Sequence, residues 1–203
     1  MKVRPANRRG IETVQRILDA ACVLFARQGV RTTTLDEIGR LSGTGRGQLY
    51  HFFADKSDLV SDVIAQQVER VLEAQQPLLG SISTAADVDA WCREAVAIYE
   101  HGDDPMRCPI GSLVHELAEG DTAARLALAD GFSRWRELLA EGLRRVDAAG
   151  ELATGADPDA FAAALLASYE GGVLIAQATG SVEILRQALR AISSAALAES
   201  EGA

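Results

Sequence analysis

The segment from Thr33 to Lys56 constrains the fold of this chain most strongly. Thr34 is a good N-cap for a helix that begins at Leu35, and Glu37, three residues on, completes a capping box. Gly43 lies where this helix must stop, because glycine adopts the left-handed conformation that ends helices at little cost. A second helix is predicted to begin near Gly45 or Arg46. Two short helices joined by a glycine-containing turn are typical of a helix-turn-helix.

The second of these helices divides its side chains in a way that suits duplex DNA. Its apolar residues are expected to face inward, which leaves a polar set outside. Arginine and glutamine pair with guanine and adenine edges, and tyrosine and histidine commonly hold phosphates. Gly47 would allow the backbone to approach the sugar-phosphate wall. The predicted DNA-binding residues are Thr33, Thr34, Thr44, Arg46, Gly47, Gln48, Tyr50, His51 and Lys56.

The distribution of charge supports this interpretation, although the whole chain of 203 residues has a net charge of −9. Residues 1–56 contain ten basic and five acidic side chains, a net charge of +5. The remaining residues contain ten basic and twenty-four acidic side chains, a net charge of −14. Such asymmetry is a nucleic-acid signal, since the acidic part repels phosphates and orients the basic part toward DNA.

Residues 8–56 resemble the TetR family of transcriptional regulators. The matching pattern is Thr33-Thr34, Ile38, Gly43, Gly47, Leu49, Tyr50, Phe53 and Lys56. The resemblance implies an all-α dimer with a three-helix DNA-binding domain and a helical ligand-binding domain. Gly39, Ser42, Thr44 and Gly45 depart from the family pattern, and these departures leave the operator sequence open. We expect the Thr44 hydroxyl to replace the cap that Gly45 lacks.

Helical periodicity continues through the chain and predicts an all-α fold of about nine helices. The first carries Ile11, Val14, Leu18, Cys22 and Phe25 on its apolar stripe, with Cys22 buried. We divide the chain into a DNA-binding domain, 1–56, and a ligand-binding and dimerisation domain, 57–203. The helix that follows Asp55 or Ser57 links them. The predicted helices span 8–28, 35–42, 46–53, 57–79, 84–99, 108–119, 121–148, 157–179 and 181–199.

The last two predicted helices have more apolar surface than one neighbouring helix can cover. The first is rich in alanine and glycine, and the second repeats leucine, isoleucine and alanine at helical spacing. Either they are buried within the monomer or they form half of a four-helix interface. Because a helix-turn-helix protein usually reads a palindrome as a two-fold dimer, we predict a homodimer through residues 157–199.

Aromatic residues of the second domain indicate a small-molecule site. The predicted pocket residues are Trp91, Tyr99, Met106, His115, Phe132, Trp135 and Tyr169. Ordinary core packing is the alternative for each of them. The segment Cys108–Leu113 with Glu116-Leu117 resembles the LmrA-like subgroup of TetR regulators, over roughly residues 80–195. This resemblance implies a response to planar apolar compounds.

The sequence contains none of the common catalytic or metal-binding patterns. It has no nucleophile elbow, paired-histidine motif or phosphate-binding glycine loop. Its three cysteines follow no metal-ligand spacing. We therefore expect neither enzyme activity, cofactor nor metal. No apolar signal region opens the chain, and the apolar run 161–180 contains Glu170, so we expect a cytoplasmic protein with no membrane span.

These observations predict a ligand-responsive transcriptional repressor that binds a palindromic operator in double-stranded DNA. A small apolar effector would change the tilt of helix 57–79 and release the operator. Two alternatives remain open. One is a helical enzyme or sequestering protein whose N-terminal unit binds a protein. The other is a thiol-based redox regulator that uses Cys108.

Overall fold

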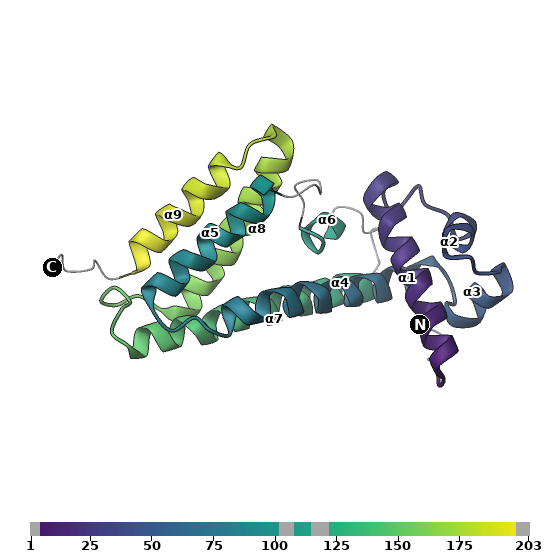
Figure 1. The fold of residues 1–203 in the computed structure, drawn as a ribbon, viewed down its shortest axis with the longest axis horizontal. Helices are drawn as coiled ribbons and strands as arrows, with labels where there is room; N and C mark the ends of the chain where they lie inside the picture. Colours follow the sequence, from purple (N-terminus) through teal and green to yellow (C-terminus); the bar gives the residue numbers. More distant parts are fainter. Residues whose placement is uncertain (1–4, 102–107, 115–121, 198–203) are drawn as a thin grey trace. The chain divides into compact units, whose positions relative to one another are not determined.

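The computed structural model describes residues 5–101, 108–114 and 122–197, with the backbone alone at His101, and it confirms the all-α fold class (Figure 1). Within these ranges there are nine helices and no strand. The helices are α1 (Arg8–Gln28), α2 (Leu35–Ser42), α3 (Arg46–Phe52), α4 (Lys56–Leu79), α5 (Ala85–His101), α6 (Gly111–Val114), α7 (Thr122–Ala148), α8 (Pro158–Thr179) and α9 (Glu183–Ala196).

The chain forms two compact units, which we describe separately. Unit 1 comprises residues 1–71 and 112–131, and unit 2 comprises residues 72–111 and 132–203. Helices α4 and α7 therefore each contribute residues to both units. The division into domains 1–56 and 57–203 stays a prediction.

Local signals set the boundaries of the unit 1 helices. Asn7 caps α1 by accepting the backbone N–H of Gly10, and Gly29 ends this helix. Thr34 and Glu37 form the predicted capping box of α2. The Asp55 carboxylate accepts the backbone N–H of Asp58 at 2.9 Å, which identifies Asp55, rather than Ser57, as the cap of α4. Each cap satisfies N–H groups that the first helical turn leaves unpaired.

The apolar stripe predicted on α1 is only partly correct. Val14, Leu18 and Phe25 are buried, but Ile11 is 56% exposed and Cys22 is half-buried. The buried face of α1 also includes Ile17 and Ala21, so its centre lies about a quarter-turn from the predicted stripe. Ile11 lies in the first turn of α1, at the margin of this buried face, and it is exposed.

In unit 2, α9 packs against both α8 and α5 (Figure 1). Asp157 caps α8 with Pro158 at its first position, and Gly180 ends it in the left-handed conformation with φ of 71°. The end of α4 contacts α7, where Arg145 donates hydrogen bonds to the carbonyls of Ile82 and Leu79 at 2.7 and 3.1 Å. These contacts join the elements of unit 2 around one apolar core.

Helices α8 and α9 approach each other most closely at Gly172. A Cβ atom at Gly172 would lie 2.8 Å from the Cα of Leu185, a separation that real side chains do not reach. Gly172, Ala176, Leu185 and Leu189 are buried in this contact. By length and hydropathy alone, α8 could cross a membrane, but this buried side is what a core helix of a water-soluble fold also has.

The remaining sides of these two helices stay uncovered in the protomer. The exposed or half-buried residues recur every three or four positions, so each helix presents one continuous stripe of small and apolar side chains. The α8 stripe is Ala163, Ala167, Gly171, Leu174 and Ala178, and the α9 stripe is Ile184, Ala188, Ala191 and Ala195. The sequence left two alternatives for these helices, burial within the monomer and a four-helix interface. In the structure one side of the pair faces the monomer core and the other faces outward.

The end of α9 differs from the prediction. Instead of continuing toward Glu199, the helix ends at Ala196, and Leu197 is extended. The N–H of Ala153 donates to the Ala196 carbonyl at 2.9 Å, and Leu152 and Leu197 form an isolated antiparallel bridge. The connection between α7 and α8 therefore holds the end of α9.

We predict that Gly172→Ala destabilises the fold by about 1–3 kcal/mol, the usual cost of overpacking a close helix contact. The matched control is Gly47→Ala, because a Cβ atom at this glycine of α3 meets nothing within 4 Å and Gly47 lies outside the α8 and α9 stripes. Urea unfolding of both variants at equal concentration measures the difference. Equal loss of stability in the two variants would contradict the close approach of α8 and α9.

Candidate functional site

The turn between α2 and α3 has the geometry that its glycine predicts. Gly43 adopts a left-handed conformation with φ of 66°. The N–H of Thr44 then donates to the Gly39 carbonyl at 2.9 Å, five residues back, as in a Schellman motif. This arrangement ends α2 sharply and directs the chain into α3. The two helices are therefore held at a defined angle within unit 1.

The cap of α3 differs from the expected arrangement. Gly45 is the N-cap and offers no side-chain hydrogen bond. Thr44 does not replace it, because its Oγ1 is buried and has no hydrogen-bond partner among the described residues. The expectation that Thr44 caps α3 is therefore wrong: the left-handed Gly43 turns the Thr44 side chain toward the interior. Phe53 closes the other end of the helix.

Helix α3 separates an apolar side from a polar side as predicted. Leu49, Phe52 and the following Phe53 are buried. Figure 1 shows α3 next to α2, and a groove of about 600 Å³ lies between these two helices and their turn. The exposed residues of α3 are Arg46, Gly47, Gln48, Tyr50 and His51.

Arg46 is oriented by two neighbours. Its Nε lies 3.5 Å from a carboxylate oxygen of Asp36 on α2. Its guanidinium carbon lies 5.9 Å from the centre of the Tyr50 ring, at cation–π distance. Both members of the ion pair are mostly exposed, so the pair adds little stability. Its effect is to place the guanidinium at the mouth of the groove.

The three threonines and Lys56 of the predicted set lie in different environments. Thr33 is 1% exposed, and its hydroxyl donates to the Gly29 carbonyl at 2.8 Å. Thr34 is exposed, but its hydroxyl is used in the capping box with Glu37. The Lys56 ammonium donates to the Arg31 carbonyl at 3.2 Å, and burial lowers the pKa of this amine while Glu37 raises it. Thr33 and Thr44 thus lie beneath the surface.

Sequence reasoning missed three residues that shape this surface. Asp36 and Arg40 line the groove from α2. Arg16 of α1 donates to the Ser42 carbonyl at 3.4 Å, next to the turn. The position of Asp36 and Arg40 four residues apart on α2 was the available signal, because both must then lie on one side of that helix.

The structure gathers four of the seven predicted pocket residues in unit 2. Tyr169 of α8 lies at the centre, with ring centroids 6.0 Å from Trp91, 6.3 Å from Tyr99 and 5.3 Å from Trp135. The hydroxyls of Tyr99 and Tyr169 share a hydrogen bond of 2.9 Å. Phe132 is half-buried, while Met106 and His115 lie outside the described residues. We call Trp91, Tyr99, Trp135 and Tyr169 the aromatic cluster.

Polar atoms beside the aromatic cluster are buried without partners. The indole N–H of Trp135 and one carboxylate oxygen of Glu170 have no hydrogen-bond partner among the described residues. By contrast, Trp91 donates its indole N–H to Gln75 at 2.9 Å. Because unpaired buried polar atoms are rare, Trp135 and Glu170 are the groups here with unused hydrogen-bonding capacity.

Glu170 lies against the segment that precedes α6. A Cβ atom at Gly111 would clash with a Glu170 carboxylate oxygen, so the carboxyl occupies space that a side chain at this position would need. Burial raises the pKa of Glu170. Burial, reinforced by Glu170, likewise raises the pKa of the Cys108 thiol. A buried thiol that resists ionisation is a poor redox sensor, which counts against the alternative based on Cys108.

Comparison with known families agrees with this geometry. A model described as the tetracyclin repressor-like C-terminal domain matches residues 84–192, and a model of bacterial regulatory proteins of the tetR family matches residues 17–63. The chain belongs to the TetR family. It is therefore a DNA-binding transcriptional regulator, and members of this family are not enzymes.

Several TetR-family proteins are similar to this one along most of their length. AcuR of Cereibacter sphaeroides is 27% identical over 166 residues, covering 80% of this chain and 75% of AcuR. LmrA of Bacillus subtilis is 26% identical over 163 residues, covering 79% of this chain and 84% of LmrA. The structure of a SmeT–triclosan complex matches with a TM-score of 0.74 and 27% identity, covering 94% of each chain.

We predict that Glu170→Gln raises the unfolding temperature of this TetR-family protein more at pH 8 than at pH 5. The pKa of this carboxyl is higher in the folded state than in the unfolded state, where it is near 4.5. The protonated carboxyl therefore contributes fully to stability below pH 4.5, and this contribution is lost as the pH rises through the folded-state pKa. The glutamine side chain does not ionise, so its contribution to stability does not change between these pH values. Scanning calorimetry at both pH values measures the effect.

The control is Glu94→Gln, which changes an exposed acid on the same unit. It should shift the unfolding temperature equally, and little, at both pH values. A Glu170→Gln variant that behaves like this control would show that the carboxyl is not held in a desolvated environment.

Proposed function

We propose that this protein is a cytoplasmic, homodimeric repressor that releases its operator when a small, largely apolar molecule binds unit 2. The observation that carries the proposal is the polar surface of α3, which presents hydrogen-bonding side chains while its apolar residues are buried. A recognition helix needs this separation, because its outer side must enter the major groove while its inner side anchors it.

The exposed residues of α3 are the proposed contacts. Arg46 and Gln48 have the donors and acceptors that read guanine and adenine edges, and Tyr50 and His51 would hold phosphates. Lys56 and Thr34 lie near the surface and would contact the backbone of the duplex. Thr33 and Thr44 are buried, so in this proposal they support the turn instead of touching DNA.

Dimerisation is proposed through the outward stripes of α8 and α9. The small residues of the α8 stripe allow a second copy to approach closely, and Leu174 and Ile184 are large apolar side chains left 53% and 44% exposed. Two copies would bury both stripes in a four-helix contact. This contact would set the two recognition helices about 34–36 Å apart, the spacing of successive major grooves.

The aromatic cluster is the proposed effector site. It combines rigid apolar surface with unused hydrogen-bonding groups at Trp135 and Glu170, which is the usual make-up of a small-molecule site. SmeT, which one solved structure shows in complex with triclosan, is described as the repressor of a multidrug efflux pump. Because α4 contributes residues to both units, a ligand that favours another tilt of α4 would alter operator binding.

We predict that Arg46→Ala weakens binding to a specific operator by about 1–3 kcal/mol, the usual contribution of one bidentate base contact. The fold should not change, because Arg46 is exposed and its ion pair with Asp36 is weak. Fluorescence anisotropy with a labelled duplex from the DNA flanking the gene measures the loss. Circular dichroism checks the fold.

Arg136→Ala is the matched control, since it removes an exposed arginine from unit 2 and should leave operator affinity unchanged. Equal affinity of the Arg46→Ala variant and the native protein would remove Arg46 from the interface. Triclosan serves as the effector probe in the same assay. Release of the operator together with quenched tryptophan fluorescence is expected, because both of the chain's tryptophans belong to the aromatic cluster.

We predict that Leu174→Glu converts the dimer to a monomer, because it places a charge within an apolar stripe. The expected loss is about 2 kcal/mol or more, a factor of roughly 30 in the dimer Kd. Sedimentation velocity at several concentrations measures it. Leu126→Glu is the control, since Leu126 is a leucine that is 65% exposed on α7, outside the stripes. A Leu174→Glu variant that stays dimeric would place the interface elsewhere.

A further inference from the structure

A second cavity in unit 2 lies apart from the aromatic cluster. It is a groove of about 560 Å³ between α5 and α9, within the size range of small-molecule sites. The residues of its floor are Cys92, Val96, Leu189 and Ser193, all of them buried. None of the aromatic-cluster residues lines this groove. It therefore has an apolar base of its own.

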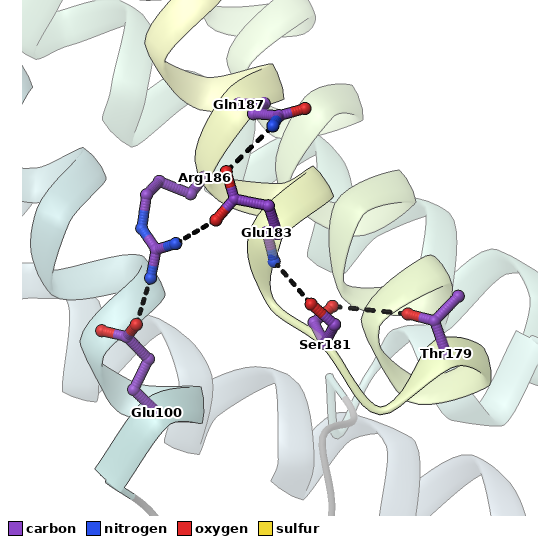
Figure 2. Close-up of polar contacts among 6 residues, drawn as sticks. All are labelled: Glu100, Thr179, Ser181, Glu183, Arg186 and Gln187. Atoms are coloured by element: carbon purple, nitrogen blue, oxygen red, sulfur yellow. Dashed lines mark hydrogen bonds and ion pairs between the residues drawn. The ribbon is translucent and has the colours of Figure 1, made fainter.

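One end of the groove is closed by an ion-pair network. Arg186 of α9 forms ion pairs with Glu100 of α5 and with Glu183 of its own helix (Figure 2). Gln187 also donates to Glu183, at 2.9 Å. Figure 2 shows the Arg186 side chain between the two carboxylates, so its charge is neutralised within the protein. Arg186 therefore joins α5 to α9, and its guanidinium is fully used by two carboxylates, which exceed it by one negative charge.

Two other arginines line the groove without such partners. Arg93 on α5 and Arg190 on α9 are exposed, and neither has an ion pair or a side-chain hydrogen bond among the described residues. Asp89 also lines the groove and is likewise unpaired, so it offsets one of these two charges. Counted together with the Arg186 network, the groove has three arginines and three carboxylates, so its two unpaired guanidinium groups, and not an excess of positive charge, distinguish it.

We propose that the groove between α5 and α9 binds a small amphipathic anion, whose apolar chain lies over Cys92, Val96 and Leu189 and whose carboxylate pairs with Arg93 and Arg190. The two unpaired guanidinium groups and the apolar floor complement the two parts of such a molecule. Planar guanidinium groups bind carboxylates through paired hydrogen bonds. The exposed Ser194 hydroxyl at the rim supplies a further donor.

This site is independent of the proposed dimer contact. The groove residues of α9 are Arg186, Leu189, Arg190, Ser193 and Ser194, whereas its outward stripe contains Ile184, Ala188, Ala191 and Ala195. At 100° per residue, the centres of these two sets lie on nearly opposite sides of the helix. A dimer through the stripe therefore leaves the groove side of α9 open.

Isothermal titration calorimetry with octanoate tests the proposal. Two further probes serve as comparisons: 1-octanol has the apolar chain without the charge, and acetate has the charge without the chain. Octanoate is expected to bind saturably with one site per protomer and at least tenfold more tightly than either probe. The Arg93→Gln/Arg190→Gln variant should bind octanoate at least tenfold more weakly. The Arg125→Gln/Arg136→Gln variant, which removes two exposed arginines of α7, should bind as the native protein does.

Three results would overturn the proposal. One is an absence of saturable octanoate binding to the folded native protein. Another is equal octanoate affinity in both double variants, which would remove the arginines from the site. The third is loss of octanoate binding in Trp135→Phe while the Arg93→Gln/Arg190→Gln variant retains it, which would place the anion at the aromatic cluster. Operator release by triclosan is scored separately, so the two proposals can fail independently.

Discussion

The continuity of α4 is the constraint on which both units depend. One hydrogen-bonded helix from Lys56 to Leu79 supplies buried side chains to unit 1 through Leu59, Ile64 and Val68, and to unit 2 through Leu72 and Leu79. The two cores therefore share one helix, although each has its own set of packing partners.

Much of the fold could be predicted from sequence because its boundaries depend on local chemistry. The Thr34 capping box, the left-handed Gly43 and the Asp157-Pro158 start of α8 each follow from residues close in the chain. The failures involve packing between distant residues. The exposure of Ile11 and the half-burial of Cys22 depend on what lies opposite α1, and the burial of Thr44 depends on how the turn folds over α2. No local pattern contains that information.

In the candidate site, too, features that depend on local sequence could be predicted, whereas features that depend on distant contacts could not. The polar side of α3 was predictable because Leu49, Phe52 and Phe53 identify its buried side. The hydrogen bond between Tyr99 and Tyr169 joins residues 70 positions apart, and composition alone could indicate only that aromatic residues gather. In the sequence, Glu170 is only a charge that interrupts an apolar run. Its role became visible only when the structure placed it against Gly111, where the missing side chain makes room for the carboxyl.

The bridge between Leu152 and Leu197 closes α8, α9 and their connection into a ring of backbone. A hydrogen bond from Ala153 to Ala196 holds the two ends of this ring, and the contact at Gly172 holds its middle. Sliding α9 along α8 would therefore have to break the tie at one end and the interlocked contact at the centre together. The pair is mechanically one body, so any rearrangement of unit 2 moves the hairpin as a whole and bends the chain outside it.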